Sequence, residues 1–262
     1  MNTSNIHILN LSLGYLMLLI PMGIMLWLKI GLIGKTALAA LRMTVQLLFV
    51  GFYLQVVFEA DNFWLTLAWL IIMVTVADFT IIRGCGLKLR RFLSSLFIAL
   101  LAGTAIPLIY FVGVILTDKN LLAPQFAIPI GGMILGNCLR ADVIGIAGFY
   151  ESIKENRKSF LLTLSQGASL TEAVRPHFRK AFSKALMPTI STMSAIGLVS
   201  LPGMMTGVIL AGADPITAIK YQIAIMISIF TGTSITIALG ILLTTKKCFT
   251  DYGLPVDDIF IT

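Results

Sequence analysis

The feature that most constrains this chain is a series of apolar runs, each about as long as a lipid bilayer is thick. The hydrocarbon core of a bilayer takes about 20 apolar residues of helix. Of the 262 residues, 58% are hydrophobic and only 12% are charged. A soluble domain has roughly 25% charged residues, so lipid rather than water must surround most of this chain.

These apolar runs are predicted to be helices. Lipid satisfies no backbone polar group, and the alternating pattern of a barrel strand is absent from the runs. The prediction is therefore an all-α integral membrane protein with about seven transmembrane helices. The expected spans are at about 8–28, 37–58, 63–82, 92–116, 127–149, 186–211 and 219–243.

Basic residues are concentrated in alternate loops of this predicted bundle, and lysine and arginine favour the cytoplasmic side. Fifteen of the 19 lysines and arginines fall in the segments 29–36, 83–91 and 150–185 and in the tail. The other side has Lys119 and Lys220, beside Glu59, Asp61, Asp118 and Asp214. This pattern predicts an N-terminus outside and a C-terminus in the cytoplasm. Residues 1–262 are expected to form a single transmembrane domain whose net charge of +7 needs no nucleic-acid partner.

The stretch KIGLIGKTAL, residues 29–38, ends like a phosphate-binding loop. The complete pattern G-x-x-x-x-G-K-[ST] requires a glycine at the position of Lys29, and a β-strand must precede it. An apolar run of membrane-spanning length precedes it here. We interpret the stretch as a short basic loop between two spans, so no nucleotide site is expected in this chain.

The segment 150–185 is the one long polar stretch, and its apolar residues recur at helical spacing. The residues Gly-Ala-Ser at 167–169 interrupt this pattern. Ser169 is suited to cap a helix start, with Glu172 as its capping-box partner three residues on. The pattern predicts two cytoplasmic helices joined at a tight turn. The alternative is a solvated connector that only links two spans.

Two parts of the sequence are similar to known transport proteins. The helix predicted after Gly-Ala-Ser leads into LMP at 186–188 and resembles the cytoplasmic coupling loop of ABC (ATP-binding cassette) permeases, although the glutamate usual before the Gly-Ala is missing. The stretch IGLVSLPGMMTGVILAGADPITAIKYQIAIM at 196–226 closely resembles the FetB-type ABC permease family, which includes a bacterial iron-export permease and plant relatives tied to aluminium tolerance. LRMTVQLLFVGFYL at 41–54 and GGMILGN at 131–137 resemble the same family.

This resemblance implies a permease subunit in the bacterial inner membrane that is not itself an enzyme. A separate FetA-like ATP-binding subunit would bind ATP and Mg²⁺, and the permease would form a homodimer surrounded by membrane lipid. The resemblance implies export of iron, with a nucleotide sugar or another small solute as the rival cargo. A secondary transporter that needs no ATP is the alternative from another class. Residues expected to couple to the ATPase are Gly167, Ala168, Ser169, Glu172 and Arg175.

Polar residues inside a span are costly, so they are candidates for a transport pathway. Arg42 and Asp78 are expected at similar depth, roughly 6–8 Å from the inner ends of their spans, where an ion pair is geometrically possible. Its alternative role is structural neutralisation near the interface. Gln46 lies one turn beyond Arg42 on the same face.

Three polar residues fall in the fifth predicted span. Asn137 lies within the resemblance and is a further pathway candidate. Arg140 and Asp142 either pair locally or mark where the helix leaves the bilayer.

The sixth predicted span contains helix-breaking residues. Pro202 removes a backbone hydrogen bond, and Gly203 loosens the adjoining turn, so the helix is expected to kink or unwind there. A broken helix exposes backbone groups to a cavity, which makes this segment a candidate hinge. Met204 and Met205 come directly after the break and serve either as packing side chains or as soft sulfur ligands. Which residues would bind a metal is unknown from the sequence.

Overall fold

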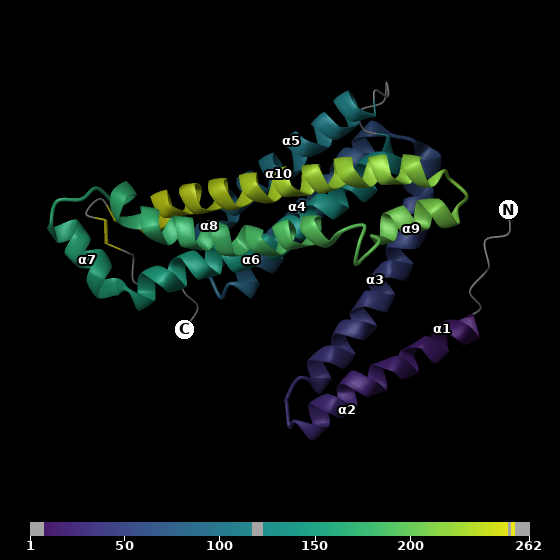
Figure 1. Cartoon of the computed structure of the whole chain (residues 1–262), viewed down its shortest axis with the longest axis horizontal. Coiled ribbons are helices and arrows are strands. Elements are labelled where there is room, and N and C mark those ends of the chain that lie inside the picture. The colour runs from purple at the N-terminus through teal and green to yellow at the C-terminus, as the bar shows by residue number, and fades with distance from the viewer. Residues whose placement is uncertain (1–7, 117–122, 251–252, 255–262) are drawn as a thin grey trace. The chain divides into compact units, whose positions relative to one another are not determined.

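The structure is a computed structural model that describes residues 8–116, 123–250 and 253–254. Within these residues the chain is nearly all helical (Figure 1), and a bridge of strand type joins Ile196 and Ser200. The helices are α1 (Ile8–Tyr15), η1 (Leu16–Leu18), α2 (Leu19–Trp27), α3 (Ile33–Ala60), α4 (Phe63–Gly84), α5 (Leu89–Tyr110), η2 (Phe111–Ile115), α6 (Pro124–Glu155), α7 (Arg157–Ser165), α8 (Leu170–Ala195), α9 (Gly203–Leu210) and α10 (Pro215–Cys248).

Five of these helical stretches are long and apolar enough to cross a membrane, and a shorter apolar helix covers Leu11–Trp27. The five are Ile33–Ala60, Phe63–Gly84, Arg91–Ile115, Pro124–Glu155 and Pro215–Cys248. This confirms a helical integral membrane protein. The count of seven spans and their orientation stay predictions. Two of the charged residues used to predict the orientation, Asp118 and Lys119, lie outside the described residues.

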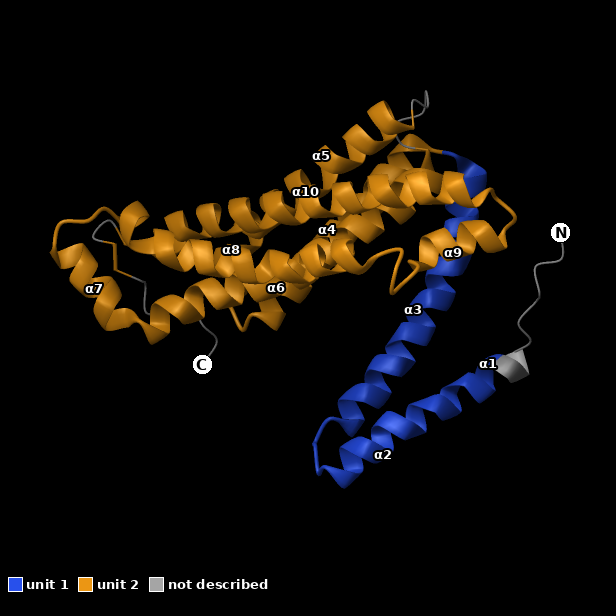
Figure 2. Cartoon of the chain, viewed as in Figure 1, with its two compact units in different colours: residues 1–61 blue, residues 62–262 orange. Residues whose placement is uncertain are grey.

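The chain divides into two compact units, residues 1–61 and residues 62–262 (Figure 2). The first unit is a helical hairpin in which α2 turns through residues 28–32 into α3. The Thr36 hydroxyl donates to Met25 Sδ at 3.7 Å across this turn. Val57 is the one described residue of α3 that is buried. The hairpin therefore presents almost its entire apolar surface outward, as a lipid-facing element does.

The second unit has a continuous apolar core built around α10, which contacts α5, α6 and α8. Large buried side chains such as Phe92, Phe111 and Phe149 fill this core. Buried threonines on α10 are satisfied within their own helix: Thr233 donates to the Ile229 carbonyl at 2.9 Å. Such internal hydrogen bonds let polar side chains lie in an apolar interior.

Small residues let α5 and α10 approach each other closely. A Cβ atom on Gly232 would lie 2.6 Å from the Gly103 carbonyl oxygen and 2.8 Å from Ile134. Interfaces between membrane helices are enriched in such small residues because backbones can then pack in direct contact. The Gly103–Gly232 contact therefore fixes how α5 lies against α10.

We predict that Gly232→Val destabilises the protein, because a backbone oxygen cannot move aside as a flexible side chain can. Overpacking of this kind costs about 1–3 kcal/mol. Thermal unfolding of the purified protein in detergent, followed by loss of the monodisperse size-exclusion peak, measures the effect. Gly148→Ala is the matched control, since nothing lies within 4 Å of a Cβ there. Equal midpoints for the two variants would contradict the packing argument.

Candidate functional site

The predicted interruption of the sixth span is present, and it is longer than expected. Helix α8 ends at Ala195, the chain is non-helical from 196 to 202, and α9 begins at Gly203. Gly197 has φ +86, a left-handed conformation that favours glycine. Its N–H donates to the Ser200 carbonyl at 3.0 Å, which closes a small loop. Pro202 is extended and precedes the first turn of α9, so it marks the end of the break.

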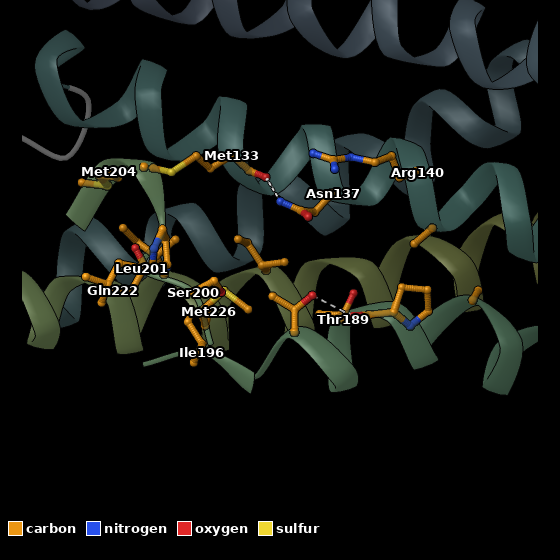
Figure 3. A pocket seen from close by; sticks show the side chains of 18 of the residues that line it. Met133, Asn137, Arg140, Thr189, Ile196, Ser200, Leu201, Met204, Gln222 and Met226 are labelled. Atoms are coloured by element: carbon orange, nitrogen blue, oxygen red, sulfur yellow. Dashed lines mark hydrogen bonds between the residues drawn. The ribbon is translucent and has the colours of Figure 1, made fainter. Parts of the chain in front are cut away.

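A pocket of about 480 Å³ lies against this break, between α6, α8 and α10 (Figure 3). The predicted pathway residue Asn137 lines it, and its Nδ2 donates to the Met133 carbonyl at 2.8 Å. Other polar residues of the lining are Arg140, Thr189, Thr192, Ser200 and Gln222. The structure thus brings polar side chains from three helices to the point where the backbone leaves its helix.

A second pocket of about 400 Å³ shares part of this wall. Pro202 and Gln222 line both pockets. Met204 lines the first and Met205 the second, so the two thioethers do not converge on one space. In the part of the chain that the structure describes, no three His, Cys, Asp or Glu side chains form a group that could hold a metal ion. The geometry therefore favours packing as the role of the two methionines.

Two carboxylates are buried away from both pockets. Asp78 on α4 is 0% exposed and Asp142 on α6 is 2% exposed. Neither oxygen of Asp78, nor Oδ1 of Asp142, has a hydrogen-bond partner among the described residues. The Thr236 side chain lies within hydrogen-bonding reach of Asp142, which also interacts electrostatically with Asp78. Membrane-buried carboxylates of this kind are functional candidates by default.

Arg140 and Asp142 do not pair with each other. Arg140 Nε donates to the Gly136 carbonyl at 3.3 Å, and Asp142 faces the core instead of the pocket. Local pairing is therefore wrong for Arg140, which lines the pocket. The alternative, that Arg140 marks where the helix leaves the bilayer, stays a prediction.

Arg42 and Gln46 lie on α3 in the first unit and are exposed within it, whereas Asp78 belongs to the second. Because Arg42 and Asp78 belong to different units, their ion pair stays a prediction, as does the single-domain organisation of residues 1–262.

The polar segment after α6 is a folded hairpin of α7 and the first half of α8. Gly167 has φ +90 in the turn between them. The capping box is present: Ser169 N donates to Glu172 Oε2 at 2.8 Å, and Glu172 N donates to Ser169 Oγ at 3.4 Å. The Ser169 hydroxyl also donates to Glu172 Oε2 at 2.7 Å, and this bond, together with the one from Ser169 N, lowers the pKa of the Glu172 carboxyl. The predicted tight turn between two helices is confirmed.

The hairpin is packed against the rest of its unit. Phe160 of α7 is 1% exposed, and its ring lies 6.1 Å from the His177 ring of α8 and 5.9 Å from that of Phe249. His177 Nδ1 is 2.8 Å from Ser152 Oγ on α6. The segment is therefore more than a solvated connector. Arg175 is exposed on its surface, in the first turns of α8.

Sequence reasoning missed four polar residues of the pocket, Thr189, Thr192, Ser200 and Gln222. The threonines lie where a span was predicted to begin, and hydroxyl groups are common in membrane helices because they bond to their own backbone, as Thr192 does to the Pro188 carbonyl at 2.9 Å. Gln222 carried a usable signal, since a glutamine inside a span is as costly as an asparagine such as Asn137.

The fold and the site together define a helical integral membrane protein with an interrupted helix beside a pocket that contains polar side chains. A family model matches residues 8–249, and the chain belongs to that family, the uncharacterised protein family UPF0014. The resemblance to the FetB-type permeases is thereby confirmed.

Curated relatives cover most of the chain. A UPF0014 membrane protein of Synechocystis sp. is 38% identical over 81% of this chain and 82% of its own length. The protein named "Probable iron export permease protein FetB" of Escherichia coli is 31% identical over 95% of both chains. "Protein ALUMINUM SENSITIVE 3" of Arabidopsis thaliana is 32% identical over 76% of this chain and 71% of its own length. No solved structure matches.

We predict that Arg42 and Asp78 are energetically coupled. If they form an ion pair, Arg42→Met or Asp78→Asn alone leaves one charge unpaired, whereas the double variant removes both. The double variant should then lose about 1–3 kcal/mol less than the sum of the single losses. Unfolding of the purified protein in mixed micelles by added sodium dodecyl sulfate measures each free energy.

The control cycle pairs Arg42→Met with Asp214→Asn, which removes the carboxylate that caps α10. The losses in free energy of unfolding caused by these two single substitutions should add in the double variant. Additive losses for Arg42 and Asp78 as well would show that the two residues do not interact.

Proposed function

We propose that this chain is the membrane-spanning permease subunit of an ABC transporter, and that it exports a metal ion, most directly iron, from the cytoplasm. The observation that carries the proposal is the similarity to the FetB protein of Escherichia coli, which extends over 95% of both chains. That protein's name gives both the permease role and iron export. The chain itself does not hydrolyse ATP in this proposal, because a FetA-like ATP-binding subunit binds ATP and Mg²⁺.

The proposed topology has seven crossings in the bacterial inner membrane, with the N-terminus outside and the C-terminus in the cytoplasm. The five long apolar helices supply five crossings, α1 to α2 supplies the first, and the end of α8 with α9 supplies the sixth. Under this arrangement the hairpin of α7 and α8 projects into the cytoplasm. The basic residues of the segment 150–185 support that side.

The turn of this hairpin is the proposed docking point for the ATP-binding subunit. Gly167, Ala168 and Ser169 form the turn, and Glu172 and Arg175 follow on the first turns of α8. Helix α8 continues without interruption for 26 residues, from Leu170 to Ala195. At 1.5 Å rise per residue it is a rod about 39 Å long. It would transmit a displacement of the turn directly to the break and its pocket.

In the assembled transporter two permease chains would pair with two ATP-binding subunits. The rival cargo is a nucleotide sugar or another small solute, and the rival mechanism is secondary transport without ATP. Secondary transport by a carboxylate relay needs several intramembrane acidic groups. Asp78 and Asp142 are the two that the described core contains, and neither lines the pocket.

We predict that charge reversal at the turn prevents assembly with the ATP-binding subunit. Arg175→Glu, combined with Ala168→Glu, places acidic groups at the docking point without altering Gly167, whose φ of +90 favours glycine. The ATP-binding subunit should then be lost from the tagged permease during co-purification. Arg179→Glu is the matched control, because it reverses an exposed charge one turn further along the same helix. If the double variant retains its partner and the transport rate is unchanged, this docking point is wrong.

We predict that Pro202→Ala leaves binding of the ATP-binding subunit intact but separates ATP hydrolysis from transport. Alanine permits a regular helix where proline marks the end of the break, so the segment 196–202 loses its preference for the open form. Gly203→Leu should act more strongly. A Cβ on Gly203 meets nothing within 4 Å, but Gly203 lines the pocket, so the longer leucine side chain would occupy pocket space or meet a second protomer.

Hydrolysis and transport are both measured in vesicles, beside the thermal unfolding midpoint of the purified complex. Normal midpoints with continued hydrolysis and lost transport support a hinge. Normal transport by both variants, or loss only through misfolding, would mean that the break is a static feature of the fold.

A further inference from the structure

The pocket at the break contains one charged side chain. Arg140 lines it from α6, and every other residue of the lining is uncharged. The side chain is exposed, and its Nε donates to the Gly136 carbonyl. Arg140 forms no ion pair with a carboxylate in the part of the chain that the structure describes. The pocket therefore has a formal charge of about +1.

Contact with the membrane surface does not explain this cation if the fifth span is 127–149, as predicted. Arg140 then lies roughly 14 Å from the inner end of the span and roughly 20 Å from its outer end. Either distance exceeds the reach of an arginine side chain that extends to the headgroup region. An arginine at such a depth is expensive, and it is kept where it faces a water-filled cavity or an ion pathway.

The surroundings of the guanidinium are suited to an anion. Asn137 lies one turn away on α6, and the hydroxyl groups of Thr189 and Thr192 line the same pocket from α8. Gln222 Oε1 is buried without a hydrogen-bond partner among the described residues; as an acceptor it would receive a hydroxyl group of the ligand rather than bind an anionic oxygen. A guanidinium fork matches the geometry of a carboxylate or phosphate, and neighbouring amides and hydroxyls can bind its remaining oxygens.

We infer that Arg140 anchors the anionic group of the transported ligand, a carboxylate or a phosphate, in this pocket. The inference rests on the proposed function in one respect, that the ligand is the cargo. A bare metal cation would be repelled by Arg140 and would find no carboxylate in the pocket lining. A metal cargo would therefore cross as an anionic complex with an organic acid.

An anionic lipid headgroup has the same phosphate chemistry as a dissolved anion, so the experiment must separate the two. The purified chain is placed in nanodiscs of phosphatidylcholine, without any ATP-binding subunit. Binding of labelled citrate, alone and as its ferric complex, is measured by equilibrium dialysis, beside Mn²⁺ as a free cation. A second set of discs contains phosphatidylglycerol.

The expected result is saturable binding of citrate and ferric citrate to the wild-type chain, and none of Mn²⁺. Arg140→Gln should weaken citrate binding by about tenfold or more, because a charge-assisted hydrogen bond is lost. Arg140→Lys should restore part of it. Lys220→Gln, which removes an exposed positive charge outside the pocket, should leave the affinity unchanged. Size-exclusion profiles and unfolding midpoints verify that each variant is folded.

Three results would overturn the inference: no saturable citrate binding to the wild type, equal affinity in the folded Arg140→Gln variant, or tighter binding of Mn²⁺ than of either citrate form. Loss of citrate binding in the phosphatidylglycerol discs would identify a lipid headgroup as the occupant and would also overturn it. Because no ATP-binding subunit is present, binding that depends on Arg140 stands even if the chain fails to assemble into a transporter. A failure of citrate binding likewise would not contradict the proposed assembly of the chain with an ATP-binding subunit.

Discussion

Lipid cannot hydrogen-bond to a peptide group, and the rest of this structure depends on that constraint. A membrane-buried backbone must satisfy itself in helices, or else line a cavity that admits water or ligand. The described chain obeys the first condition everywhere in its long apolar helices and departs from it at residues 196–202. There the Gly197–Ser200 hydrogen bond satisfies part of the backbone, and the pocket of about 480 Å³ lies against the remainder. The interruption and the pocket therefore follow from the same requirement, that a non-helical backbone in a membrane must line a cavity.

The same constraint connects the pocket to the polar hairpin. Helix α8 continues from the capping box at Ser169 to Ala195, although Pro176 and Pro188 each lack the backbone N–H of a helical hydrogen bond. One continuous helix therefore links the surface turn to the break. At the far side of the pocket, α6 carries Arg140 and Asn137, while its opposite face buries Asp142 in the core against α10. A movement of α8 would change the space beside Arg140, because Thr189 and Thr192 of α8 line the same pocket.

Local sequence signals predicted much of the fold and only part of the site. The apolar runs predicted the helical membrane class, and a pattern four residues long predicted the Ser169–Glu172 capping box. Both features could be predicted because each depends on residues that are neighbours in the sequence. The break was expected at Pro202, yet it begins at Ile196, since the left-handed Gly197 closes a loop that proline alone does not reveal. The pocket could not be predicted, because its prediction requires knowing that α6, α8 and α10 meet. For that reason the sequence indicated only a local or interfacial role for Arg140 and gave no sign of Thr189 as a pocket residue.

The central claim is that this chain moves a metal cargo across the membrane at the expense of ATP hydrolysed by a separate subunit. Its most direct test is transport by the permease and its ATP-binding subunit, purified together and reconstituted in liposomes with the ATP sites facing outward. With iron supplied as its citrate complex, the account predicts accumulation of iron inside the vesicles when Mg²⁺ and ATP are added, and none with a non-hydrolysable ATP analogue. Iron movement by the permease alone on an ion gradient, or sustained ATP hydrolysis by the complex with no iron moved, would contradict it.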